Sequence, residues 1–115
     1  MDASPDLFAA TLERVDGNSI VVLVGELDLD TAPELARVLD PLLDEGPSEV
    51  LVECSDLSFI DSSGIAVLVA AQMRLKGRGA HLALRSLTPH AMKTFATVGL
   101  TEFLNVEPAD PRSIA

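Results

Sequence analysis

The segment Asp61-Ser62-Ser63-Gly64 places two hydroxyl groups and a carboxylate at the predicted start of a long helix. An apolar run, Val50-Leu51-Val52, and a polar segment precede it, and a helical pattern of apolar residues begins at Ile65. Backbone N–H groups are unpaired at a helix start and the helix dipole is positive there, so a phosphate placed there is stabilised. Asp and Ser are also common helix caps, and the four residues taken alone favour that structural role.

An enzyme that used Ser62 or Ser63 as a nucleophile would need a base beside it. The sequence has two histidines, His81 inside a predicted strand and His90 in the first turn of a predicted helix, and structural roles are favoured for both. No Gly-x-Ser-x-Gly elbow surrounds the serines, and no lysine follows Gly64 as in a phosphate-binding loop. We therefore expect no catalytic residue and no enzyme activity, and no motif supports nucleotide binding.

Two further groups could do chemistry, the acidic stretch 25–30 and the single cysteine. Carboxylates in 25–30 could hold a metal, but no histidine or regular ligand spacing accompanies them, which favours a solvated loop. Cys54 has Glu53 and Asp56 beside it rather than basic residues, so a small buried thiol is expected instead of a nucleophile. No metal and no cofactor are expected.

The composition is that of one globular domain. The chain has 115 residues, 48% of them hydrophobic, which suffices for one core. Eighteen acidic residues against eight basic give a net charge of −10, so nucleic acid and anionic membranes are poor partners. The charge serves either solubility or the steering of a basic protein partner. No apolar run approaches the length of a membrane span, and a soluble, cytoplasmic protein is expected.

Apolar periodicity and turn residues predict four strands and three helices. The strands are expected over 7–12, 19–24, 49–53 and 80–85, the helices within 31–46, 62–77 and 88–99, and a last short helix or edge strand over 100–106. The first two strands form a hairpin, and the later alternation of strand and helix implies parallel pairing with right-handed crossovers. The prediction is an α/β domain over 1–106 with a mixed sheet of four to five strands and three to four helices, followed by a flexible tail over 107–115.

Some local expectations follow from individual residues. Thr31 and Glu34 have the spacing of a capping box, and Pro41 should kink the first helix or end its regular part. Phe95 and Val98 are expected to face the core from the last helix. The run 20–24 is apolar on both faces and should lie inside the sheet.

Two segments resemble the signature of the STAS domain, specifically of the bacterial anti-sigma factor antagonists. They are Gly25-Glu26-Leu27-Asp28, with Thr31 shortly after, and the more specific Asp56-Leu57-Ser58-Phe59-Ile60-Asp61-Ser62-Ser63-Gly64-Ile65. The resemblance spans roughly 7–106 in element order, which implies a STAS-like fold.

What the resemblance implies is partner switching. In such antagonists the serine directly after the aspartate, here Ser62, is phosphorylated by an anti-sigma factor that is itself an ATP-dependent serine kinase. The unmodified antagonist binds that anti-sigma factor and frees the sigma factor, and a phosphatase resets the modified form. The resemblance places Asp28, Asp61 and Ser62 in the partner-binding surface, with Ser63 and Gly64 as neighbours. Parallel pairing of the strands that precede Asp28 and Asp61 should bring these two residues together at one sheet edge.

An alternative keeps the fold without the switch. Other STAS domains are non-catalytic interaction modules in soluble signalling scaffolds or lipid-transport complexes. The serine after the aspartate, Ser62, favours the antagonist. No feature of the sequence fixes an oligomeric state.

Overall fold

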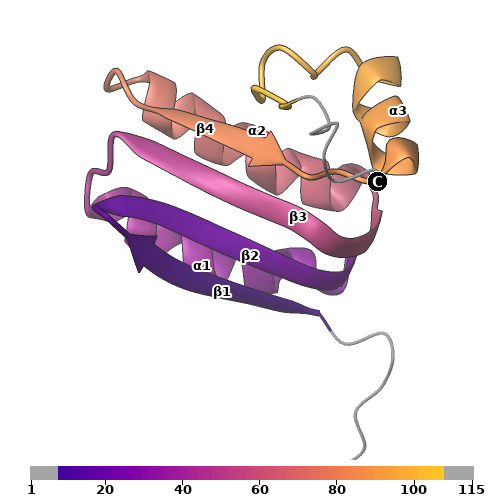
Figure 1. The fold of residues 1–115 in the computed structure, drawn as a ribbon, viewed down its shortest axis with the longest axis horizontal. Helices are drawn as coiled ribbons and strands as arrows, with labels where there is room; N and C mark the ends of the chain where they lie inside the picture. The colour runs from indigo at the N-terminus through magenta and orange to yellow at the C-terminus, as the bar shows by residue number, and fades with distance from the viewer. Residues whose placement is uncertain (1–7, 108–115) are drawn as a thin grey trace, which may run out of the picture.

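The computed structural model describes residues 8–107, which form a four-stranded mixed sheet and three helices (Figure 1). In chain order the elements are β1 (Ala9–Val15), β2 (Asn18–Leu27), α1 (Ala32–Asp44), β3 (Glu49–Ile60), α2 (Ser62–Lys76), β4 (His81–Arg85) and α3 (Pro89–Thr97). The strand order is β1-β2-β3-β4, with β1 antiparallel to β2 and the other pairs parallel. The predicted α/β fold is confirmed. Residue Leu7 of the first predicted strand and residues 108–115 of the predicted tail lie outside the described residues.

Helices α1 and α2 lie side by side on one face of the sheet (Figure 1). The hydrophobic core lies between these helices and the sheet. Burying a leucine contributes about 1.5–3 kcal/mol, so the fully buried leucines of these layers hold the sheet and helices together. The core positions on the four elements concerned are Val21, Leu23 and Leu27 of β2, Val50, Val52, Cys54, Leu57 and Ile60 of β3, Ala32, Leu35, Leu39, Leu42 and Leu43 of α1, and Ile65, Leu68, Ala71 and Leu75 of α2.

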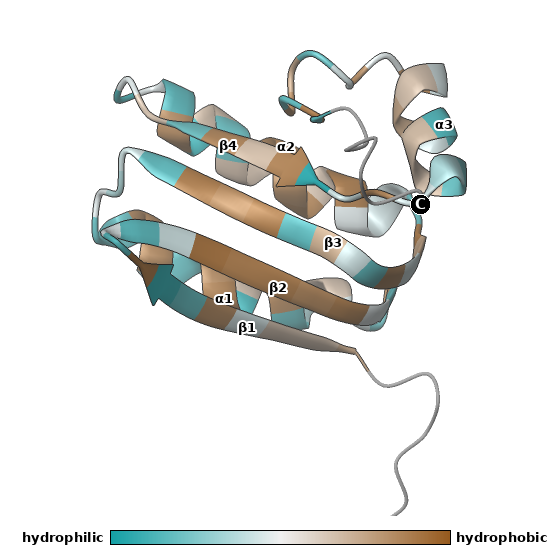
Figure 2. Cartoon of the chain, viewed as in Figure 1, coloured by the Kyte–Doolittle hydropathy of each residue, from teal (hydrophilic) through white to brown (hydrophobic). Residues whose placement is uncertain are grey.

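Strand β2 lies between β1 and β3, as its apolar sequence predicts, and Figure 2 shows its hydrophobic colour along most of its length. Its two faces differ. Val21 and Leu23 are fully buried under the helices, whereas Ile20 and Val22 on the opposite face are half-buried and Val24 is exposed. The described helices therefore cover only one face of the sheet.

Strand β3 is twelve residues long, and the prediction that it ends at Glu53 in a polar loop is wrong. Its register against β2 shifts twice, so that Val22 pairs with Glu53 but Leu27 pairs with Ile60. Each shift adds one residue to β3, as in a β-bulge, and a bulge interrupts the alternation of buried and exposed side chains. Buried residues consequently recur every third position near the end of β3, a pattern that resembles a loop in sequence.

Helix α1 departs from two local expectations. Thr31 precedes the helix but makes no side-chain cap hydrogen bond, so the predicted capping box with Glu34 is wrong. The helix also continues through Pro41 to Asp44, so the expectation that its regular part ends at the proline is wrong, whereas the alternative of a kink stays a prediction. A proline inside a helix costs about 3 kcal/mol, and the burial of the neighbouring leucines on this amphipathic helix outweighs that cost.

The C-terminal part packs beside β4. Phe95 of α3 is fully buried as predicted, but Val98, just after α3, is 54% exposed and does not face the core. The segment 100–106 is a series of turns that ends in an isolated parallel bridge between Val106 and Leu84. The buried amide of Gln72 on α2 accepts from the N–H of Leu82 at 2.7 Å and donates to its carbonyl oxygen at 3.1 Å, which ties α2 to β4.

Candidate functional site

The two signature segments meet where β2 and β3 end. Leu27 pairs with Ile60, and the N–H of Asp61 donates to the carbonyl oxygen of Leu27 at 3.2 Å. Asp28 and Asp61 are the residues that directly follow these two strands. The structure therefore confirms the expectation that the acidic stretch and the start of α2 lie at the same edge of the sheet.

Asp61 is the N-cap of α2. Its Oδ1 accepts from the N–H of Ser63 at 2.8 Å and from that of Gly64 at 3.4 Å, while its carbonyl oxygen accepts from the N–H of Ile65 at 3.0 Å. Two of the N–H groups expected to be unpaired are thus already bound by a carboxylate. A phosphate at this helix start would have to compete with Asp61 for them.

The two serines differ in exposure. Ser62, the first residue of α2, is exposed, whereas Ser63 is half-buried. Consecutive residues at a helix start project about 100° apart, so one serine faces solvent when the other turns toward the protein. Ser62 is the accessible hydroxyl.

Gly64 lets α2 pack directly on the strand ends. A Cβ added there would lie 2.7 Å from Cδ2 of Leu27 and 3.2 Å from Cγ1 of Ile60, closer than side chains tolerate. Gly64 is buried, so it supports the site by allowing this close approach instead of offering a surface for contact.

Asp28 builds a tight turn. Its Oδ1 accepts from the N–H groups of Asp30 at 3.0 Å and Thr31 at 3.1 Å. The hydroxyl of Thr31 accepts from the N–H of Asp28 at 2.8 Å, and lies 2.8 Å from the carbonyl oxygen of Glu26 and 3.1 Å from Oδ1 of Asp28. Asp28 and Thr31 therefore fix the turn 28–31, which explains why the threonine hydroxyl does not cap α1.

Sequence reasoning missed the apolar side chains at this edge. Leu29, in the turn 28–31, is 74% exposed, and Phe59, near the end of β3, is 44% exposed. The signal was present in the sequence, because Leu29 stands between two aspartates in a turn, where an apolar residue cannot reach the core. These two side chains add apolar surface to a region otherwise defined by serine and carboxylates.

Two titratable groups of β3 have shifted pKa values. Burial raises the pKa of the Cys54 thiol to about 12, with a smaller contribution from the charge of Glu53. The expected buried thiol is present, and it is protonated at neutral pH. Burial also acts to raise the pKa of Glu53, but hydrogen bonds from Arg85, at 2.6 Å, and from Ser55 outweigh it and lower that pKa below its ordinary value. Neither group lies at the start of α2.

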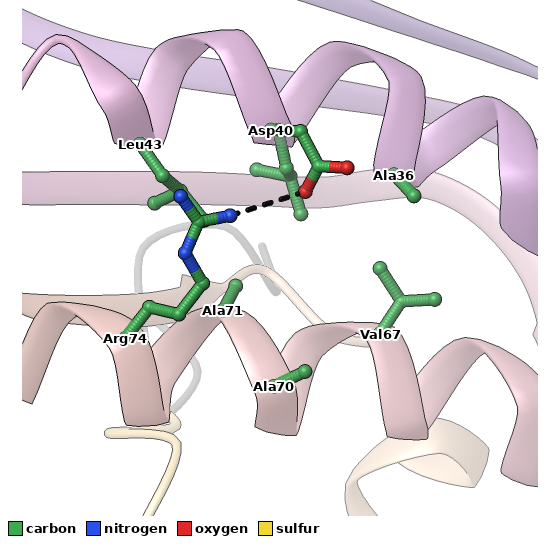
Figure 3. Close-up of a pocket in the computed structure, with 8 residues that line it drawn as sticks. Ala36, Asp40, Leu43, Val67, Ala70, Ala71 and Arg74 are labelled. Carbon is green, nitrogen blue, oxygen red and sulfur yellow. Dashed lines mark hydrogen bonds and ion pairs between the residues drawn. The ribbon is translucent and has the colours of Figure 1, made fainter.

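His81 and the groove between α1 and α2 both lie away from the start of α2. His81 pairs with Glu49 at 3.0 Å, at the opposite end of β3 from Ile60. A groove of about 130 Å³ between α1 and α2 is lined by alkyl groups and by the ion pair of Arg74 with Asp40, at 3.3 Å (Figure 3). It holds no nucleophile, and its nearest approach to Ser62 along α2 is Val67.

No group of three or more His, Cys, Asp or Glu residues within 8–107 is arranged to hold a metal ion. Within the same range, each helix is too short or too polar to cross a bilayer.

Known proteins share this sequence pattern and fold. The family model described as "Mlab, STAS domain" matches residues 10–106. The anti-sigma-B factor antagonist of Bacillus subtilis (strain 168) is 30% identical over 86 residues, which cover 75% of this chain and 78% of that protein.

Solved structures give the same architecture. The crystal structure of an anti-sigma factor antagonist from Mycobacterium paratuberculosis superposes with a TM-score of 0.84 at 24% identity, covering 97% of this chain and 95% of that one. The anti-sigma factor antagonist SpoIIAA in its unphosphorylated form gives a TM-score of 0.76 at 23% identity and covers 92% of each chain. At these identities the structural likeness supports the fold alone.

Proposed function

Because this chain belongs to the STAS domain family and its curated relatives are anti-sigma factor antagonists, we propose that it is an anti-sigma factor antagonist that works by partner switching. In its unphosphorylated form it binds an anti-sigma factor that is a serine kinase and so releases a sigma factor. Phosphorylation of Ser62 ends that binding, and a phosphatase restores it. The domain is the one expected over 1–106, of which the structure describes 8–106, and we place it in the cytoplasm with those partners.

The observation that carries the proposal is the position of Ser62. Its hydroxyl is exposed on the first residue of α2, while the preceding Asp61 anchors the helix start to the end of β2. The turn fixed by Asp28 lies at the same edge. An accessible hydroxyl on a rigid surface suits a kinase substrate, since the kinase must align the oxygen with the phosphoryl group of ATP.

The transfer itself requires only an acceptor from this chain. The hydroxyl oxygen of Ser62 bonds to the γ-phosphorus of ATP held by the kinase, the bond from that phosphorus to the bridging oxygen breaks, and ADP leaves. The hydroxyl proton passes to a base of the kinase. The chain is a substrate and a binding partner in this scheme.

The phosphorylated form should bind poorly because of what surrounds Ser62. The new group carries about −1.5 to −2 charges, and Asp61 already occupies the N–H groups of Ser63 and Gly64. In a closed interface the dianion would be desolvated without a partner built for it, which costs several kcal/mol. Since about 1.4 kcal/mol is tenfold in affinity, we expect binding to weaken by at least about a hundredfold.

Titration calorimetry tests the proposal. The anti-sigma factor kinases of the source organism are purified and titrated with the wild-type chain before and after full phosphorylation with Mg·ATP. A Ser62→Ala chain should bind as the wild type does and should not respond to ATP. Equal affinity of the phosphorylated and unphosphorylated chains would contradict the switch.

A second candidate is a non-catalytic STAS interaction module in a soluble signalling scaffold or a lipid-transport complex. The description of the matching family model, "Mlab, STAS domain", favours keeping it. Such a module needs no phosphoacceptor. It predicts that the chain is not phosphorylated by any anti-sigma factor kinase and that Ser62→Ala leaves its assembly unchanged.

A further inference from the structure

Two exposed apolar side chains lie at the same edge as Ser62. Leu29 comes two residues after Leu27 at the end of β2, and Phe59 comes directly before Ile60 at the end of β3. Leu27 and Ile60 pair with each other, so Leu29 and Phe59 both lie at the edge of the sheet where β2 and β3 end. Apolar side chains in such a position gain free energy when a partner removes them from water.

The turn that carries Leu29 is held firmly. The N–H of Thr31 donates to the carbonyl oxygen of Asp28 at 3.2 Å, which places Leu29 and Asp30 at the centre of a four-residue turn. The bonds from Asp30 and Thr31 to Oδ1 of Asp28 lock the same four residues. A side chain on a preorganised turn loses little further freedom on binding, so its burial contributes more to affinity.

Carboxylates surround these apolar side chains. Asp28 and Asp30 flank Leu29 in sequence, and Glu26 is the cross-strand partner of Phe59. An apolar pair with an acidic border fits a recess whose rim carries lysine or arginine. It does not fit nucleic acid or an anionic membrane, which would be repelled by the border.

We propose that Leu29 and Phe59 are the apolar anchors by which this chain docks on its anti-sigma factor kinase, in a recess bordered by basic residues. This inference rests on the proposed function and adds the residues that supply contact beyond Ser62. Asp28 and Thr31 act as positioning residues, because they hold the turn that presents Leu29.

The test uses Leu29→Ser and Phe59→Ser against a matched control, Met73→Ser. Met73 is 63% exposed on α2 and is similar in size to leucine, so it controls for the loss of an exposed apolar side chain elsewhere. With each purified kinase that binds the wild-type chain, we expect the two anchor variants to bind about tenfold more weakly or worse and the control to be unchanged. The Michaelis constant for the antagonist in the phosphorylation of Ser62 should rise likewise, with kcat unchanged.

Rescue distinguishes an anchor from a structural residue. Leu29→Met keeps an apolar side chain on the turn and should restore wild-type affinity. Thermal unfolding is measured for every variant, and if Phe59→Ser fails to fold, the more exposed Leu29 decides the matter. If the wild type binds and is phosphorylated but Leu29→Ser matches Met73→Ser, the anchor assignment is wrong while the proposed function stands. If no kinase binds the wild type, the proposed function fails and the anchors fail with it.

Discussion

The N–H of Asp61 donates to the carbonyl oxygen of Leu27 at 3.2 Å, and this bond fixes the start of α2 to the end of β2. The two residues are far apart in the sequence and belong to two different signature segments. Through this contact the exposed hydroxyl of Ser62 and the turn fixed by Asp28 become parts of one surface.

Phosphorylation should occur on Ser62 and not on Ser63. Ser62 is exposed, while Ser63 is half-buried and its N–H is bound to Asp61. We expect Ser62→Ala to abolish phosphate incorporation and Ser63→Ala to retain it. Phosphopeptide mapping by mass spectrometry after incubation with the kinase and Mg·ATP reads this directly. Full phosphorylation of the Ser62→Ala chain would refute the assignment.

Loss of the cap on α2 should destabilise the domain. Asp61→Ala removes the acceptor of the N–H groups of Ser63 and Gly64, and such a loss typically costs about 0.5–2 kcal/mol. Asp61→Asn keeps an oxygen acceptor at the same position and should cost less. Urea unfolding monitored by circular dichroism compares the two variants. Equal free energies of unfolding for Asp61→Ala and wild type would show that the cap contributes nothing.

The charge of Asp28 and its role in the turn can be separated. Asp28→Asn keeps an Oδ1 acceptor for Asp30 and Thr31 and removes only the charge. The free energy of unfolding should therefore be unchanged, whereas the affinity for the anti-sigma factor should fall. Asp28→Ala removes the acceptor as well and should lower the free energy of unfolding by about 1 kcal/mol or more. Calorimetry and urea unfolding measure both variants. If Asp28→Asn binds the anti-sigma factor with unchanged affinity, the charge of Asp28 does not contribute to the interface.

Gly64→Ala should be among the more disruptive small changes in the chain. The added methyl group would meet the side chains of Leu27 and Ile60 at the start of α2, and overpacking of this kind costs about 1–3 kcal/mol. Gly77→Ala is the matched control, because a Cβ there lies 3.5 Å from the nearest atoms, an ordinary contact. The difference between their thermal unfolding midpoints is the measurement, and a midpoint for Gly64→Ala as high as that of the control would contradict the close packing.

The phosphorylated domain should remain folded. Asp61 already binds two N–H groups at the start of α2, so the phosphate gains little from them. The repulsion between the phosphate and Asp61 is weakened because Ser62 is exposed to solvent and salt screens its charge. We expect a stability change within about 1 kcal/mol, small against the 5–15 kcal/mol typical of a domain. Thermal unfolding of both forms checks this. A phosphorylated chain that melts far earlier would mean that binding is lost through unfolding. Ser62→Asp should weaken binding only in part, since one carboxylate carries less charge than a phosphate.

Much of the fold was accessible from local sequence. The start of α2 after Asp61 and the start of α3 after Thr88 are where the capping residues predict them, because a cap acts on N–H groups within three residues of itself. The element order and the parallel pairing also follow from periodicity and chain connectivity. The adjacency of Asp28 and Asp61 came from that order together with the general geometry of parallel strands.

The tertiary structure decided what depends on a partner far along the chain. The two register shifts between β2 and β3 turned a predicted polar loop into strand, since a bulge exists only relative to the neighbouring strand. Pro41 stays inside a helix because buried leucines hold α1 against the sheet, and Val98 is exposed although its spacing suits a buried face. The hydroxyl of Thr31 serves a turn instead of a capping box because Glu26 and Asp28 offer closer partners. Sequence determined which elements form and in what order, whereas side-chain roles at the site depended on contacts that no local pattern encodes.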